Sequence, residues 1–163
     1  MRSTNFTTVG VIDTSNVTQF TTAFDGSKVK IIPLIDTSKV TAWAYTFANS
    51  LVESLPQLNY SSAVSFDSTW RSNKIVDFKF QSIQGLQVTN YANAWSYSVL
   101  NAQSVDGILT TIRDNANTFN LNNGTLGVNA GTNAAPTDGS VTGMNGIQAK
   151  ADLIARGWNV TTN

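Results

Sequence analysis

"VIDTSNVTQFTTAFDGSKVKIIP" occupies residues 11–33, and "LIDTSKVTAWAYTFANSLVESLP" follows it without a gap over residues 34–56. A shift of 23 positions lays the second stretch on the first. The matching pairs are Asp13 and Asp36, Thr14 and Thr37, Ser15 and Ser38, Phe20 and Trp43, Phe24 and Phe47, and Pro33 and Pro56. The polar triplet and the large apolar residues are kept, whereas the positions between them vary.

The same spacing continues further along the chain. A second shift of 23 brings in "QLNYSSAVSFDSTWRSNKIVDFK", and a shift of 25 brings in a fourth copy that includes Val88, Tyr91 and Trp95. One aligned series of aromatic residues is Phe20, Trp43, Phe66 and Tyr91. Stacked repeats need this pattern, because each unit hides one apolar face against its neighbours while its outer face is free to vary.

Within one unit the spacing predicts two kinds of element. Val40, Trp43 and Phe47 lie at helical intervals, and Asp36 can accept amide hydrogens at a helix start. We therefore expect short helices near residues 15–25, 38–48, 61–71 and 86–96, and short strands in "KVKIIPLI" and its equivalents. The predicted fold is an α/β solenoid, a short leucine-rich-repeat array of about four strand-plus-short-helix units of 23–25 residues.

The stretch "VKIIPLIDTSKVTAWAYTF" over residues 29–47 strongly resembles the BspA-like leucine-rich-repeat surface proteins of bacteria and their phages. The family usually has Met-Phe at the helix end and a Cys shortly after. This chain has Ala23-Phe24 and Thr46-Phe47 instead, and it has no Cys. The resemblance implies the leucine-rich-repeat fold and a role in surface attachment.

After residue 101 the repeat pattern ends. "QSVDGILTTIRDN" and "MNGIQAKADLIARG" read as helices, with Ile147, Ala151 and Ile154 as the apolar stripe of the second. An Asn- and Gly-rich loop or irregular hairpin lies between them, in which the alternating runs "TFNL" and "TLGV" leave one or two brief strands open, and "WNVTTN" reads as a short strand. "TNAAPT" and "LIARGWNVTTN" resemble the C-terminal tails of many phage and marine bacterial repeat proteins. We divide the chain into an N-terminal edge segment (1–10), the leucine-rich-repeat solenoid (11–101) and an α+β capping segment (102–163).

The composition excludes several classes of function. Charged residues make up only 12% of the chain and the formal net charge is zero, which disfavours nucleic acid as a partner. No apolar run approaches the length of a membrane span, so we expect no membrane insertion. "MRSTNFTTVG" has no hydrophobic stretch, so we expect no signal peptide: the protein leaves its cell without secretion, or the sequence is a fragment or a processed form.

The chain contains neither Cys nor His, which removes the commonest soft nucleophile, the commonest general base and the commonest metal ligand. Asp13 and Asp36 are better explained as helix caps than as a pair of catalytic carboxylates. One Asp per unit is too few for a calcium ladder. We therefore expect no catalytic residue, no metal and no cofactor. Most aromatic residues belong to the predicted core, and Tyr45, Tyr60 and Tyr97 are the candidates for exposed contact.

These observations favour a non-enzymatic binding or structural protein on the surface of a bacteriophage virion, such as a tail fibre, a spike or a capsid decoration. The expected partner is a host surface glycan or protein, or another virion protein, and a second copy of the chain stays open as a partner. The alternative is a repeat module of an extracellular adhesin on the bacterial cell surface. The predicted contact surface consists of variable positions in equivalent places: Lys30, Ile31, Glu53, Ser54, Val76 and Asp77.

Overall fold

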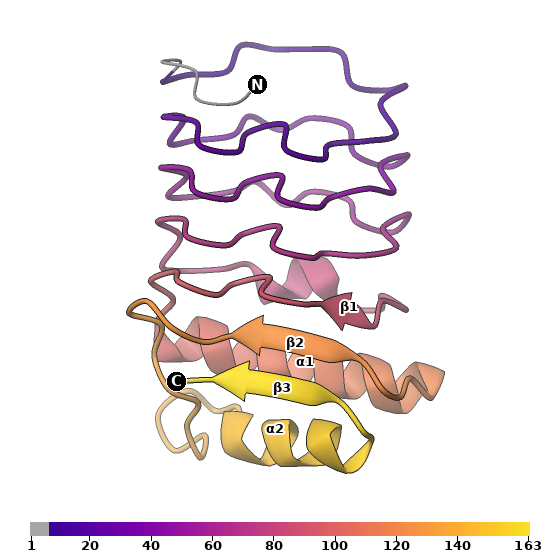
Figure 1. Cartoon of the computed structure of the whole chain (residues 1–163), viewed down its shortest axis with the longest axis vertical. Coiled ribbons are helices and arrows are strands. Elements are labelled where there is room, and N and C mark those ends of the chain that lie inside the picture. The colour runs from indigo at the N-terminus through magenta and orange to yellow at the C-terminus, as the bar shows by residue number, and fades with distance from the viewer. Residues whose placement is uncertain (1–6) are drawn as a thin grey trace.

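A computed structural model describes residues 7–163, so residues 1–6 of the predicted N-terminal edge segment lie outside the described part of the chain. Figure 1 shows a stack of layers that ends, at its C-terminal side, in a small sheet and two helices. In chain order the elements are the 3-10 helix η1 (Phe80–Ile83), β1 (Asn90–Tyr91), α1 (Ala102–Phe119), β2 (Thr125–Val128), α2 (Gly146–Ala155) and β3 (Asn159–Thr162).

The predicted α/β solenoid of leucine-rich-repeat units is wrong. The regular elements of residues 7–163 are two α-helices, one 3-10 helix and an open three-stranded parallel sheet, and the first α-helix begins only at Ala102. The stretches predicted as helices fold mainly as tight turns. The stretches predicted as strands contribute one isolated bridge, between Ile31 and Ser54. The sequence also did not predict that two strands of the C-terminal capping segment, β2 and β3, join β1 in one sheet.

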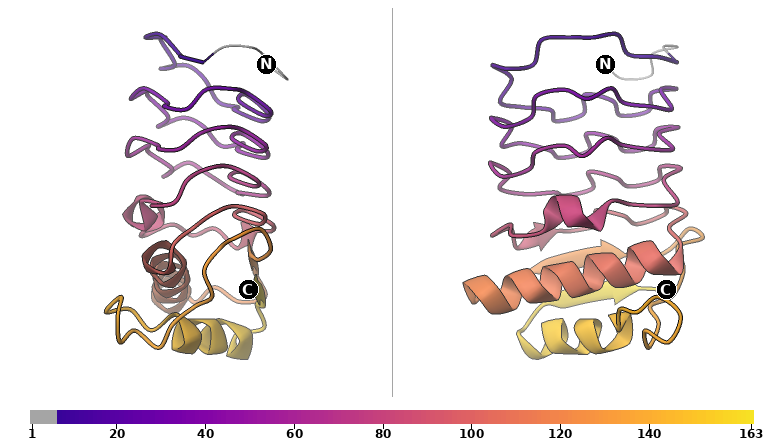
Figure 2. Two further views of the ribbon diagram at one scale, coloured as in Figure 1. Left: turned by 90° about the vertical axis from the view of Figure 1, so that its left-hand side faces the viewer. Right: turned by 180° about the vertical axis from the view of Figure 1, so that it is seen from behind.

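The turns of successive layers are joined by parallel backbone contacts. We call residues 11–33, 34–56, 57–79 and 80–101 layers 1 to 4. Isolated parallel bridges link Gln19 with Ala42 and Ala42 with Ser65. The amide of Phe20 donates to the carbonyl of Ala42 (2.9 Å), and the amide of Phe24 donates to the carbonyl of Thr46 (2.8 Å). These bonds stack the layers along the long axis of the molecule, as both views of Figure 2 show.

Within each turn, alternate amides take different partners, and this alternation explains why no helix forms. The amides of Phe20, Thr22 and Phe24 donate to layer 2, whereas the amide of Ala23 donates locally to the carbonyl of Phe20 (2.8 Å). An α-helix requires every interior amide to bond within the same helix. Half of the amides are therefore withdrawn from the helix that the apolar spacing predicts.

The turns also depend on left-handed backbone at two equivalent positions in each layer. Thr22 has φ 57°, Tyr45 φ 56° and Ser68 φ 53°. The second position is also left-handed in all four layers, at Gly26, Asn49, Ser72 and Tyr97. A left-handed residue interrupts a right-handed helix, and it is costly for a β-branched side chain such as Thr22.

The aligned aromatic residues do form a continuous core, as the sequence predicts. The ring centroids of Phe20 and Trp43 lie 5.5 Å apart, those of Trp43 and Phe66 6.3 Å, and those of Phe66 and Tyr91 5.4 Å. A second set begins with Phe24 on Phe47 and ends with Trp70 stacked on Trp95 at 4.7 Å. Each pair adds about 0.5–1.5 kcal/mol to the stabilisation that burial of the rings provides.

The sheet continues the stack at its C-terminal end. Its order is β1-β2-β3, all parallel, and Tyr91 pairs with Leu126, which pairs in turn with Val160. α1 lies behind the sheet and α2 lies against α1 at the end of the molecule (Figures 1 and 2). The two helical predictions are confirmed, and the side chain of Asn101 caps the start of α1 by accepting a 2.9 Å hydrogen bond from the Ser104 amide.

The predicted apolar stripe of α2 is wrong. Ile147 is 54% exposed and Ile154 is 50% exposed, whereas Ala149 and Leu153 are fully buried. The helix is short and carries apolar residues on two sides, so the spacing alone did not identify the side that packs on α1.

A buried carboxylate fixes the loop before α2. Asp106 on α1 is fully buried, and its oxygens accept from the Thr137 amide (2.8 Å), the Thr137 hydroxyl (2.5 Å) and the Thr142 hydroxyl (2.7 Å). A buried carboxylate needs such donors to offset the loss of its hydration. The contacts hold the loop against α1.

Thr22→Asn tests the left-handed backbone of layer 1. Asn tolerates this conformation better than a β-branched residue, so the free energy of unfolding should rise by about 1 kcal/mol. The neighbouring exposed change Thr21→Asn is the matched control and should stay within roughly 0.5 kcal/mol of wild type. Urea unfolding measures both, and equal effects of the two changes would contradict the assigned backbone.

Candidate interaction surface

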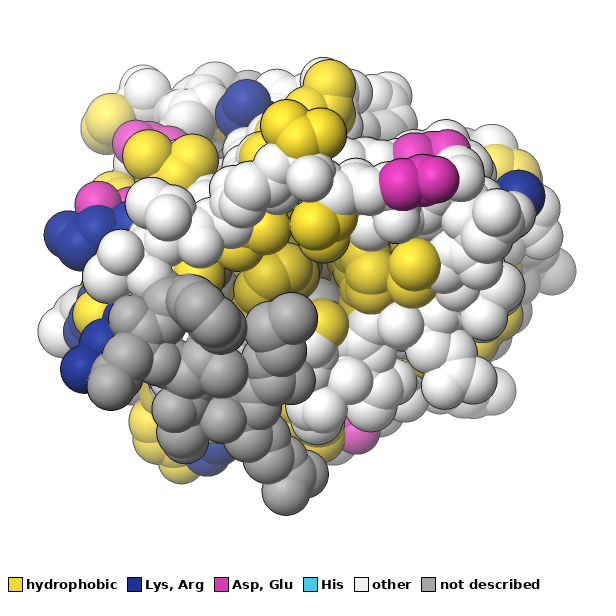
Figure 3. All heavy atoms as spheres, turned by 90° about the horizontal axis from the view of Figure 1, so that it is seen from above, with side chains coloured by type: hydrophobic (Ala, Val, Ile, Leu, Met, Phe, Trp, Pro, Cys, Tyr) yellow, Lys and Arg dark blue, Asp and Glu magenta, His cyan; other side chains and the backbone are white. Residues whose placement is uncertain are grey.

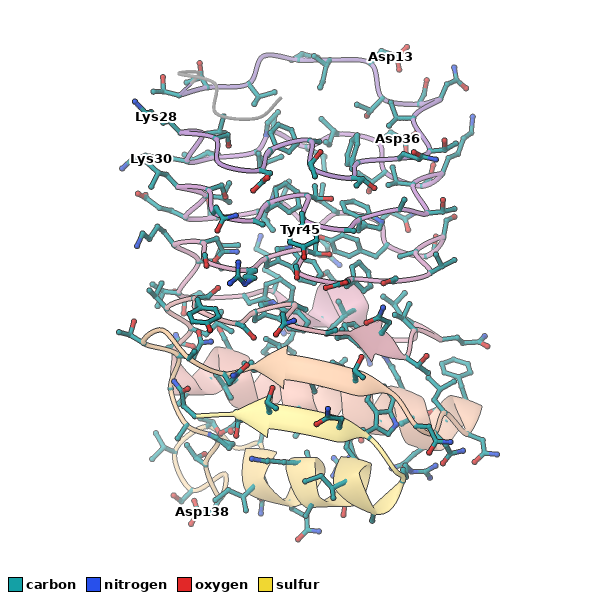
Figure 4. The ribbon with its side chains drawn as sticks, viewed as in Figure 1. Asp13, Lys28, Lys30, Asp36, Tyr45 and Asp138 are labelled. Carbon is teal, nitrogen blue, oxygen red and sulfur yellow. The ribbon has the colours of Figure 1, made fainter. Side chains whose placement is uncertain are left out.

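The six residues predicted to form the contact surface are all exposed, and the structure brings them together from three successive layers. They are Lys30, Ile31, Glu53, Ser54, Val76 and Asp77. Ile31 and Ser54 pair in a parallel bridge, and the Glu53 amide donates to the Lys30 carbonyl at 2.9 Å. In Figure 4 Lys28 and Lys30 lie at one edge of the stack, and Asp13 and Asp36 lie at the opposite edge.

A shallow depression of about 780 Å³ is centred on this surface. Five of the predicted residues line it, and the sixth, Ile31, is joined to the lining residue Ser54 by the bridge. The remaining lining residues are Leu51, Lys74 and Lys79. The depression is therefore formed by side chains of layers 1, 2 and 3 at equivalent places.

The contact surface carries more basic than acidic side chains. Lys30 Nζ lies 2.7 Å from Glu53 Oε1, and the amide nitrogen of the Asn101 side chain donates to Asp77. Lys74 and Lys79 make no ion pair with any group of residues 7–163. The Lys30–Glu53 pair is itself exposed and is worth little in water, so it can be exchanged for a partner's charge at small cost.

The same surface exposes apolar side chains between the charges. Ile31 is 66% exposed, Val76 45% and Leu51 40%. An exposed apolar set bordered by charged groups is typical of a binding surface, because the apolar part gains from burial and the charged border gives orientation.

Sequence reasoning missed Leu51, Lys74 and Lys79. A signal for the first two was present: residues 29, 52 and 75 are buried and their neighbours on both sides are exposed, so alternation places Leu51 and Lys74 beside the chosen positions. Lys79 follows the alternating stretch and carried no such signal.

Asp13 and Asp36 do not cap helices, so that prediction is wrong. Each closes a turn instead: Asp13 Oδ1 accepts from the Ser15 amide at 3.0 Å, and Asp36 Oδ1 accepts from the Ser38 amide at 2.9 Å. These bonds hold the pKa of both carboxyls below its ordinary value. Within residues 7–163 no cluster of three or more carboxylates is placed to ligate a metal ion.

The three tyrosines predicted as contact residues separate into two groups. Tyr45 is 41% exposed and Tyr97 is 53% exposed, with the Arg71 guanidinium 4.8 Å above the Tyr97 ring. Tyr60 is only 3% exposed and packs 4.7 Å from Trp43, so the prediction that it is exposed is wrong. It occupies the place of the buried Thr14 and Thr37 in the preceding layers.

Comparison of the chain with protein-family models, with curated proteins and with solved structures gave no match. None of the helices within residues 7–163 has the length and apolarity needed to cross a membrane.

The buried phenols predict a loss of stability at alkaline pH. Burial raises the pKa of Tyr60 and Tyr91 above the ordinary value of 10.0. Above pH 10 the folded chain therefore binds more protons than the unfolded chain, and the free energy of unfolding should fall by up to about 1.4 kcal/mol per pH unit for each phenol.

Tyr91→Phe is the control for this prediction, because the Tyr91 hydroxyl is buried without a hydrogen-bond partner in residues 7–163. At pH 7 the variant should be at least as stable as wild type, because it lacks a buried unpaired hydroxyl, and the alkaline fall of its free energy of unfolding with pH should be about half as steep. Urea unfolding between pH 7 and pH 11 measures both quantities. An unchanged slope in the variant would show that Tyr91 is not shielded from water.

Proposed function

We propose that this chain is a non-enzymatic attachment protein of a bacteriophage virion, which binds a host surface glycan or protein, or a neighbouring virion protein, through the contact surface. The observation that carries the proposal is the assembly of Lys30 and Ile31 with their counterparts from two further layers around one depression. The low charge and the absence of Cys in the sequence suit a particle that is exposed to varied salt and to oxidation.

The scaffold supports binding because it is rigid where the surface is built. Val29, Val52 and Ile75 are buried directly beneath the contact surface and alternate with its exposed residues. Side chains held on a packed framework lose little further conformational entropy when a partner binds. Many copies on one particle would add avidity to contacts that are weak individually.

The chemistry of the surface favours an acidic partner with an apolar face. Lys74 and Lys79 lack ion pairs within residues 7–163, and Ile31 and Val76 expose aliphatic groups beside them. Acidic glycans combine carboxylates with the apolar faces of sugar rings. An acidic protein surface with exposed aliphatic residues has the same combination.

Binding of the labelled protein to intact bacterial cells, to immobilised acidic and neutral glycans and to virions tests the proposal. Ile31→Asp should weaken binding at least tenfold, because it places a charge in the apolar part of the contact surface. Binding should also fall as salt rises from about 50 to 500 mM, since exposed charges are screened.

Val64→Asp is the matched control, because Val64 is 70% exposed, close to the 66% of Ile31, but it neither lines the depression nor pairs with a residue that does. It should bind within about twofold of wild type. Equal losses in the two variants, or no binding to cells, glycans or virions, would contradict the proposal.

A further inference from the structure

The N-terminal end of the stack has an apolar hollow. It has a volume of about 480 Å³, and its lining includes Val9, Ile12, Val17, Phe20, Ala23 and Phe24. Figure 3, which views the molecule along the stack from this end, shows hydrophobic side chains gathered inside the hollow. Phe20 and Phe24 are 7% and 8% exposed, whereas their counterparts in layers 2 to 4 are completely buried.

A row of backbone carbonyls lies beside the hollow. In layer 2 the carbonyls of Ala42, Ala44, Thr46 and Ala48 accept from the amides of layer 1. Their counterparts in layer 1 are Gln19, Thr21, Ala23 and Asp25, and these four carbonyls accept no hydrogen bond from any group within residues 7–163. Unpaired groups along an edge are a template for pairing with another chain.

The polarity of this row determines which partner fits. Two copies of the chain related by a twofold axis would place carbonyl opposite carbonyl, and no hydrogen bond would form between them. The partner must instead supply amide donors at every second residue. Layer 1 itself does so toward layer 2, where the amides of Phe20, Thr22 and Phe24 donate and the rings of Phe20 and Phe24 fill the space below.

We propose that the N-terminal edge binds an extended segment of a partner polypeptide in parallel orientation. The segment donates alternate backbone amides to the carbonyls of Gln19, Thr21, Ala23 and Asp25, and it places apolar side chains four residues apart over the hollow. Main-chain hydrogen bonds supply the affinity and the apolar side chains supply the specificity, as in other cases where a strand is added to an open edge. This surface is separate from the contact surface.

A synthetic peptide with the sequence "NVTQFTTAFDGS" of residues 16–27 is the probe, because this segment makes the equivalent contacts with layer 2. It should bind the full chain saturably and shift the ¹³C resonances of the Thr21 and Ala23 carbonyls. The same peptide with N-methyl groups at the residues that correspond to Phe20, Thr22 and Phe24 lacks three donors and should bind at least tenfold more weakly.

The variant Ala23→Glu places a charge at the hollow and should weaken binding of the peptide at least tenfold. Ala23→Thr is its matched control, since Thr46 and Thr69 occupy the equivalent places in layers 2 and 3, and it should stay within about threefold. The proposal is overturned if the peptide does not bind at about 1 mM or if N-methylation leaves its affinity unchanged. It is also overturned if the Ala23→Glu and Ala23→Thr variants bind the peptide with the same affinity. Filaments of the chain that the peptide does not disperse would identify a second copy as the occupant and would also overturn it.

Discussion

Each turn of layers 1 to 4 divides its backbone amides between two uses, and the remaining structure depends on that division. One amide donates three residues back and closes the turn, and the next donates to the following layer, as Ala23 and Phe24 do. The first use keeps each layer compact. The second holds neighbouring layers in parallel register, so that a ring in one layer lies over a ring in the next.

This register extends into the C-terminal part of the chain. Tyr91 ends the aromatic series that begins at Phe20, and it is also one of the two residues of β1 that pair with β2. The sheet and the two helices are therefore built on the last layer, and they cover that end of the core. The opposite end has no such cover within residues 7–163, which is why a row of acceptors and an apolar hollow lie there together. The contact surface, in contrast, depends on the register alone, because equivalent places in three layers bring its residues side by side.

The sequence predicted side-chain alignment well and backbone conformation poorly. The aromatic series, α1, α2, β3 and the exposure of the six predicted contact positions were found because burial leaves a pattern in the order of apolar residues. The spacing of Val40, Trp43 and Phe47 suits a turn-built layer as well as a helix, and nothing at Thr22 or Tyr45 signals left-handed backbone, since neither residue favours it. Tyr60 was misjudged because its counterparts in the register are threonines, which do not mark a core position by type.

The most direct test of the central claim is a measurement of scalar coupling across hydrogen bonds by NMR on uniformly ¹⁵N,¹³C-labelled protein. The division of amides predicts a correlation from the Phe24 amide nitrogen to the carbonyl carbon of Thr46, with the corresponding correlations from Phe47 to Thr69 and from Trp70 to Ala94. Correlations from Phe24 to Phe20, four residues back along the chain, would instead mean that the segment is helical, and they would contradict the account.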